Sequence, residues 1–409
     1  MSYLSGIFSS VFERRFARSV STDAEGLGIE ELCLELLGAQ GEVSGLTRAG
    51  LILDKYAGAS AEEKRGFFEF MIRDLEIDPV EVVERLKAYK ETPSKRSYLA
   101  YSQASEPKRQ ELLRRLNRVR GGTERLVSMR KDLLRMIRED QKLEPLDVDF
   151  EHLFASWFNR GFLRLQPINW SSPAEILEKI IAYEAVHAID SWDDLRLRLQ
   201  PADRRCFGFF HPAMPGEPLI FVEVALTKGI PNSIQNLLAA GRDPIEAEDA
   251  DTAVFYSISN CQPGLAGISF GNSLIKQVAA DLAQDLPGLE TFVTLSPIPG
   301  LSKWLQQVEH DGLRHAPLPA QAAYYLLEAK RDDKLPVDPV ARFHLGNGAA
   351  IHAVHADADI SENGMAQSGG AMVNYLYEMS QVTTNHEQFV TDKTVAASKE
   401  VRSLRASVS

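Results

Sequence analysis

A glycine-rich segment between residues 260 and 272 contains the residue types that bind phosphate groups. The run TAVFYSIS (252–259) is typical of a buried strand, and SLIKQVAADLA (273–283) is typical of a helix. A turn from a strand into a helix N-terminus presents backbone N–H groups and the positive end of the helix dipole to an anion, and glycine lets the backbone come close to it. We therefore expect a pyrophosphate-binding turn that contains Gly264, Ala266, Gly267, Ser269, Gly271 and Asn272.

The spacing of these glycines excludes two common phosphate motifs. Gly264, Gly267 and Gly271 do not form GxGxxG, and no GK[ST] follows, so neither a dinucleotide fold nor a P-loop is favoured. Acyl-CoA acetyltransferases use a similar turn with a pattern near [QR]xxGx[GA]. The best register here ends at Gly271 and places Ala266 and Ser269 where that pattern has other residues. A plain strand-to-helix turn is the alternative interpretation.

A second group of residues has the chemistry of metal ligands but the wrong spacing. His352, His355, Asp357 and Asp359 lie close together in the chain, yet AAIHAVHA (349–356) predicts a strand. Side chains three residues apart on a strand point to opposite faces, so the two histidines do not easily share one zinc ion. We expect no metal site.

Two regions of different character must position these residues. Residues 1–145 are predicted to form a helical bundle for packing or oligomerisation, since apolar residues recur at helical spacing in ELCLELL, GFFEFMIRDL and ELLRRLNRV. Residues 146–409 are predicted to form a mixed α/β domain, because short apolar runs alternate with helical stretches. The expected strands are LIFVEVALT, TAVFYSIS, TFVTLS and AAIHAVHA, while NYLYEMSQ (374–381) is expected to be helical.

Composition limits the classes of partner. The 409 residues carry a net charge of −12, which argues against nucleic acid and anionic membranes as partners. The three cysteines form no CxxC pair, and no apolar run is long enough to span a bilayer, so we expect a cytoplasmic protein. Residues 1–20 are interpreted as a docking helix, with a mitochondrial transit peptide as the alternative.

Several segments together resemble the malonyl-CoA decarboxylase family, in the same order along the chain. The specific strings are PGEPL, SPIPG and FHLxNGA, and the resemblance covers about residues 155–380. It extends more loosely over the helical part. The resembling segments are GFLRLQPINWSSPAEILEKI (161–180), HPAMPGEPLIFVEVALT (211–227), SISNCQPGLAGISFG (257–271), LSPIPGLSKWL (295–305), ARFHLGNGAAIHAVHADADIS (341–361) and MVNYLYE (372–378).

This resemblance implies a fold and a pair of site residues. The family has a helical N-terminal domain, a catalytic domain with the acetyltransferase (GNAT-like) fold, and homo-oligomers that are commonly tetramers. By motif, its serine is Ser296 and its histidine is His344. Without the resemblance, Ser296 is read as a turn or cap residue and His344 as a buried structural histidine. A GxSxG elbow is missing, so Ser296 is expected to bind the malonyl carboxylate and not to act as a nucleophile.

Other residues in the resembling segments are weaker candidates. Asn347 and Tyr375 are expected near the substrate, although Asn347 is equally typical of a turn. His187 and His211 are expected to line the cleft or hold loops. Some relatives carry an acid where Ser269 stands, so no role for that side chain is carried over.

The resemblance implies conversion of malonyl-CoA to acetyl-CoA and carbon dioxide, a reaction of fatty acid metabolism. The thioester accepts the electron pair that carbon dioxide leaves behind, so no cofactor or metal is expected; Ser296 would orient the carboxylate and His344 would manage the proton. The alternatives are an acyl-CoA N-acetyltransferase and a non-catalytic acyl-CoA-binding or scaffold protein.

Overall fold

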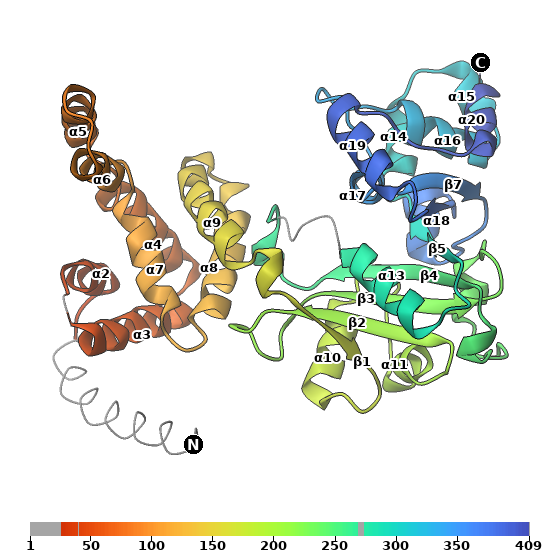
Figure 1. The fold of residues 1–409 in the computed structure, drawn as a ribbon, viewed down its shortest axis with the longest axis horizontal. Coiled ribbons are helices and arrows are strands. Elements are labelled where there is room, and N and C mark those ends of the chain that lie inside the picture. The colour runs from red at the N-terminus through yellow and green to blue at the C-terminus, as the bar shows by residue number, and fades with distance from the viewer. Residues whose placement is uncertain (1–25, 40, 269–273, 409) are drawn as a thin grey trace. The chain divides into compact units, whose positions relative to one another are not determined.

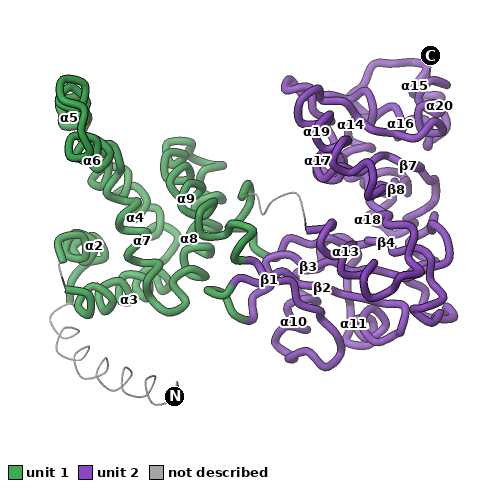
Figure 2. The backbone as a smooth tube through the Cα atoms, in the orientation of Figure 1, with its two compact units in different colours: residues 1–162, 212–215, 262–269 green, residues 163–211, 216–261, 270–409 purple. Residues whose placement is uncertain are grey.

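A computed structural model describes residues 26–39, 41–268 and 274–408. Figure 1 shows the fold, and Figure 2 shows its two compact units, of residues 1–162, 212–215 and 262–269, and of residues 163–211, 216–261 and 270–409. The division falls after residue 162 and not after residue 145, because the helix that begins at Glu144 packs with the helices before it. Ser269, Gly271, Asn272 and the N-terminal segment 1–20 lie outside the described residues.

The first unit is a helical bundle, as the apolar spacing predicted. Ser60 and Glu63 form the reciprocal cap that starts one of its helices, and Gly121, in the left-handed region with φ 71°, separates two others. Buried leucines and phenylalanines on the inner faces form the core. The helices are α2 (Ile29–Gly38), α3 (Glu42–Gly58), α4 (Ala61–Asp74), α5 (Pro79–Glu91), α6 (Lys95–Ala104), α7 (Lys108–Asn117), α8 (Gly122–Ile137) and α9 (Glu144–Trp157).

The second unit is built on a mixed sheet with the strand order β1-β2-β3-β4-β5-β8-β6, and β7 pairs with β8. This mixed architecture, with its helical N-terminal region, agrees with the predicted fold class. The four strands expected from the sequence are β3, β4, β5 and β7. The strands are β1 (Arg164–Ile168), β2 (Arg204–Phe210), β3 (Pro218–Thr227), β4 (Thr252–Asn260), β5 (Thr291–Thr294), β6 (Ser296–Pro297), β7 (Ala350–His355) and β8 (Met372–Leu376).

Most residues of the strands are buried, because helices cover both faces of this sheet. Side chains of β2, β3 and β4 pack on one face against α13, α16 and α17, and alternate side chains of β1–β3 pack on the other face against α10 and α11. The helices are α10 (Ala174–Tyr183), α11 (Trp192–Leu199), α12 (Ile234–Leu238), α13 (Leu274–Asp285), α14 (Leu301–Gln307), α15 (Asp311–His315), α16 (Leu318–Glu328), α17 (Pro339–Gly346), α18 (Glu362–Ser368), α19 (Val382–Asp392) and α20 (Lys399–Ala406).

The prediction of a helix at residues 374–381 is wrong. Residues 372–376 form strand β8, and the chain then turns before α19. Met372, Val373, Asn374 and Tyr375 are all buried, because β8 lies inside the sheet between β5, β6 and β7. A short strand with both faces buried shows no alternation of polar and apolar residues, so its pattern does not differ from that of a buried helix.

A pair of strands parts in the middle of the sheet. Strands β4 and β5 run parallel, and their pairing ends where Phe255 is opposite Thr294. The amide of Leu295 still donates to the carbonyl of Phe255, but Ser296 already pairs with Val373 of β8. Strand β4 continues on the other side to Asn260. The sheet therefore opens between residues 256–260 and residues 296–297.

Helix α17 lies at this opening, and specific residues fix both of its ends. Asp338 accepts the amide of Ala341, and Pro339 occupies the first turn, where its missing N–H costs nothing. At the other end Gly348 has φ 87°, and a Cβ atom there would lie 2.0 Å from the carbonyl oxygen of Val382. Only glycine fits this turn between α17 and β7.

We predict that Gly348→Ala destabilises the protein by about 2–4 kcal/mol, since it adds a left-handed alanine and a backbone clash. Gly346→Ala is the matched control, because the nearest atom to a Cβ there is a ring carbon of Phe389 at 3.8 Å. Urea unfolding of the two variants measures the difference. Equal midpoints for both variants would contradict this account of the turn.

Candidate active site

The opening between β4 and β6 holds a small cavity of about 240 Å³. Strand β4, the start of β6 and helix α17 supply most of its wall, and Val186 from the loop after α10 completes it. Apolar side chains dominate the lining. The lining residues are Val186, Ile220, Phe255, Tyr256, Ile258, Asn260, Ser296, Pro297, Pro339, Val340, Phe343 and His344. Ser296 and His344, the two residues expected to do the chemistry, thus line the same cavity.

Four side chains form a continuous chain of hydrogen bonds at this cavity. Ser296 Oγ lies 3.2 Å from His344 Nε2 and donates to Thr294 Oγ1 at 2.8 Å. On the other side of the ring, His344 Nδ1 lies 2.8 Å from the hydroxyl of Tyr377. All four are at least nine-tenths buried. Since the serine proton goes to Thr294, the serine accepts from Nε2–H, and Nδ1 then accepts from Tyr377.

Burial determines the charge of the histidine. Burial lowers the pKa of His344 to about 3, and no carboxylate side chain lines the cavity to counter this. The ring also stacks on Tyr375, with centroids 4.5 Å apart and planes at 23°. In the free protein His344 is therefore neutral near pH 7, and Nε2–H is a hydrogen-bond donor that faces the cavity wall at Ser296.

Thr294 joins the chain of hydrogen bonds to the sheet. Its Oγ1 also accepts the amide of Tyr375 at 3.1 Å, and its carbonyl accepts Asn374 Nδ2 at 2.8 Å. Asn374 in turn contacts His355 Nε2. His355 on β7 thus helps to hold Asn374 of β8 in place. A bulge between Ile351 and Ala353 interrupts the β7–β8 pairing nearby.

Two other predicted site residues have structural contacts. Asn347 caps α17, and its Nδ2 donates to the carbonyl of Phe343 at 2.7 Å, so its amide is engaged in the helix that carries His344. Tyr375 lies beneath the His344 ring and is fully buried. Neither residue lines the cavity, although both hold groups that do.

The sequence did not identify Thr294 or Tyr377. A signal for Tyr377 exists, because Tyr375 and Tyr377 are two residues apart, a spacing that places both on one side of an extended chain. The helical interpretation of this segment concealed it. Thr294 has no comparable signal, since a threonine in a β-rich run is ordinary.

The described part of the predicted phosphate turn belongs to the first unit. A Cβ atom at Gly264 would lie 1.9 Å from the Val127 carbonyl, and the buried Arg130 donates to the carbonyls of Gly264 and Ala266 at 3.0 and 2.7 Å. The Ala266 amide donates to Pro263, within a short turn. This amide is therefore not available to a phosphate, and the pyrophosphate-binding role stays a prediction.

His187 and His211 lie apart from the hydrogen-bonded chain. His187 belongs to the loop that supplies Val186, and burial lowers its pKa to about 4. His211 follows β2 and is nearly buried. Among the described residues there is no group of three His, Cys, Asp or Glu side chains arranged to hold a metal ion.

Family comparisons match most of the chain, from residue 75 onward. The model of the malonyl-CoA decarboxylase C-terminal domain matches residues 161–318 and 308–408, and the model of the N-terminal domain matches residues 75–158. The chain belongs to the malonyl-CoA decarboxylase family. Mitochondrial malonyl-CoA decarboxylases of Anser anser anser and Mus musculus are 35% and 33% identical to it; each alignment covers 73% of this chain, and 69% and 71% of those proteins.

Solved structures of the family agree with the fold. The crystal structure of malonyl-CoA decarboxylase from Rhodopseudomonas palustris has a TM-score of 0.87 and 46% identity, and covers 92% of this chain and 98% of its own. The one from Agrobacterium vitis has a TM-score of 0.86 and 47% identity, with coverages of 92% and 99%. The resemblance inferred from PGEPL, SPIPG and FHLxNGA is therefore confirmed.

We predict that the free energy of unfolding decreases as the pH falls, because His344 is neutral in the folded protein. An unfolded histidine titrates near 6.5 and the folded one near 3, so between these values the unfolded chain binds the extra proton. Lowering the pH from 7.5 to 5 should cost about 2 kcal/mol through this residue. Urea unfolding at both pH values, compared with His344→Gln, isolates the effect; parallel pH dependences in the two proteins would contradict it.

Proposed function

We propose that this member of the malonyl-CoA decarboxylase family, a family of carboxy-lyases, decarboxylates malonyl-CoA to acetyl-CoA in the cavity between β4 and β6. One observation carries the proposal. The Ser296–His344 hydrogen bond places two polar groups together in a cavity that is otherwise lined mainly by apolar side chains. A malonyl group needs a hydrogen-bonding partner at each end, one for its carboxylate and one for its thioester oxygen, and apolar surroundings for the CH2 group between them.

Ser296 and His344 bind the two ends of the reacting group in this mechanism. The hydroxyl of Ser296 turns away from Thr294 and donates a hydrogen bond to the malonyl carboxylate. This contact holds the breaking bond, between the α-carbon and the carboxylate, perpendicular to the plane of the thioester. The Nε2–H of His344 donates to the thioester oxygen, where negative charge develops as carbon dioxide leaves. The bond between the α-carbon and the carboxylate breaks, and its electron pair passes into the enolate.

Protonation of the enolate completes the reaction. One proton is consumed for each malonyl-CoA, and it must reach the α-carbon. A neutral imidazole is a poor acid, but an anionic carboxylate or enolate beside Nε2 favours the charged ring and raises its pKa. His344 takes up this proton from solvent as the substrate binds and delivers the Nε2 proton to the α-carbon, while the Tyr377 oxygen accepts from Nδ1–H of the charged ring. The thioester itself accepts the electron pair, so we infer that neither a metal nor a redox cofactor takes part.

We predict that His344→Asn lowers kcat by roughly 10²–10⁴-fold, as expected for the loss of a general acid. Ser296→Ala should lower kcat/KM by about 10–100-fold, because it removes one hydrogen bond to a charged group. Tyr377→Phe keeps the ring and should have the smallest effect. The measurement follows acetyl-CoA and carbon dioxide from malonyl-CoA, with purified protein and a chelator present.

Three outcomes of this assay separate the alternatives. Turnover that survives the chelator supports the proposal. Absence of turnover in the native protein, with acyl transfer from acetyl-CoA to an amine instead, would show an N-acetyltransferase. Binding of malonyl-CoA without either product would show a scaffold protein. Full activity in the Ser296→Ala, His344→Asn double variant would exclude this site.

We also infer that the protein acts as a cytoplasmic homo-oligomer, a tetramer. Helices α5 and α6, whose residues are all described, bury no side chain within the chain and expose Val80 and Val83 at 69% and 65%. An exposed apolar face of this kind is typical of a subunit contact.

The three cysteines are buried free thiols, as expected in a reducing compartment. No helix of the described residues is long and apolar enough to cross a membrane.

A further inference from the structure

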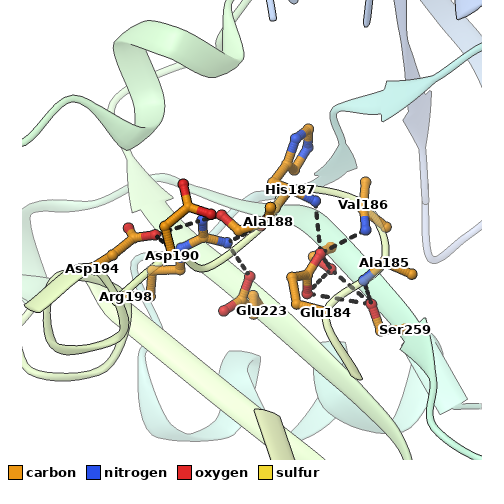
Figure 3. A network of polar contacts seen from close by, with 11 residues as sticks. Glu184, Ala185, Val186, His187, Ala188, Asp190, Asp194, Arg198, Glu223 and Ser259 are labelled. Atoms are coloured by element: carbon orange, nitrogen blue, oxygen red, sulfur yellow. Dashed lines mark hydrogen bonds and ion pairs between the residues drawn. The ribbon is translucent and has the colours of Figure 1, made fainter. Parts of the chain in front are cut away.

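The loop between α10 and α11 is held by one carboxylate. Glu184 Oε1 accepts the backbone amides of Val186 and His187, each at 2.8 Å (Figure 3). The same carboxylate accepts the hydroxyl of Ser257 at 2.9 and 2.7 Å and that of Ser259 at 3.3 Å. Both serines lie on β4, beyond the point where β5 leaves it. Glu184 therefore ties the loop to the strand that borders the cavity.

Arg198 holds the following residues of the loop. Its guanidinium donates to the carbonyls of His187 and Ala188, each at 2.8 Å, and contacts Glu223 of β3 at 3.3 Å. The Arg198 side chain is 5% exposed and that of Glu223 is fully buried. Residues 184–188 form no helix or strand, so their conformation depends on these side-chain contacts with the sheet.

This loop separates two cavities. Val186 lines the cavity that contains Ser296 and His344. The same loop, with Glu184 and His187, also lines a second and larger cavity of about 1030 Å³ on α11, α12 and α18. Without its anchor the loop has open space behind it, and Val186 has room to withdraw from the first cavity.

We propose that Glu184 is a positioning residue of the decarboxylation site, which fixes Val186 as the wall that limits the acyl group to an unbranched malonyl unit. This inference rests on the proposed function and names the substrate class that the same site accepts. Val186 forms part of the wall of the cavity of about 240 Å³, so shortening or withdrawing this side chain enlarges the space beside the acyl group. Other lining groups come from strands or from helix α17, whereas Val186 comes from a loop.

The test compares decarboxylation of malonyl-CoA and methylmalonyl-CoA. Val186→Ala and Glu184→Ala should each raise the ratio of kcat/KM for methylmalonyl-CoA over malonyl-CoA by about 10-fold, the effect of one methyl in a pocket. They should also raise KM for malonyl-CoA, because the wall contributes to substrate binding, and the ratio between the two substrates is therefore the readout. Glu184→Gln should lie near the native ratio, since its amide oxygen still accepts the two backbone amides. Glu178→Ala, at an exposed glutamate of α10, is the matched control.

A double variant shows whether Glu184 acts through Val186. If it does, Glu184→Ala adds little to the ratio once Val186→Ala is present, whereas two independent effects multiply. Multiplied effects, or a Glu184→Ala ratio equal to that of Glu178→Ala, would overturn the proposal. If Glu184→Ala does not fold, the Ser257→Ala, Ser259→Ala pair removes the anchor on β4, and an unchanged ratio there overturns it equally.

Failure of this inference is distinct from failure of the proposed function. The native protein must first turn over malonyl-CoA. Absence of that activity rejects the decarboxylation itself, and Glu184 then has no such role. Activity of the native protein together with an unchanged ratio in Val186→Ala rejects only the assignment of the wall.

Discussion

The parting of two parallel strands after Thr294 is the constraint on which the site depends. Up to that residue β5 lies between β4 and β8, and after it the chain pairs with β8 alone. Thr294 holds the chain to β8 at this point, because its hydroxyl accepts both the Tyr375 amide and the Ser296 hydroxyl. The opening provides the cavity, and the same hydroxyl orients the serine at its edge. Fold and chemistry thus share one buried threonine side chain.

Burial of His344 is the second element of the account. A charged imidazole would be costly among Tyr375, Tyr377 and Phe343, so the ring is neutral until an anion arrives. The hydrogen bond from Tyr377 sets which nitrogen faces Ser296. In the proposed mechanism His344 is therefore most basic when the cavity contains substrate, which couples proton uptake to the presence of an anionic acyl group.

Local patterns predicted the helical first unit, the strands β3, β4, β5 and β7, and helix α13, because each has a period or cap within a few residues. Ser296 and His344 were named through the SPIPG and FHLxNGA resemblance and not through chemistry, since a serine before a proline and a histidine between apolar residues are ordinary. Tyr377, which directly follows β8, was not identified because this strand is buried on both faces and its sequence was interpreted as a helix. Glu184 contacts Ser257 across 73 residues, a separation that no local pattern reports.

The proposed mechanism places the malonyl carboxylate at Ser296 and the thioester oxygen at His344, in the opening between β4 and β6. A crystal structure of the protein with a malonyl-CoA analogue whose carboxylate cannot leave tests this directly. We expect a carboxylate oxygen within about 3 Å of Ser296 Oγ, and the thioester oxygen at a similar distance from His344 Nε2. An acyl group bound outside this cavity, or a carboxylate that contacts neither side chain, would contradict it.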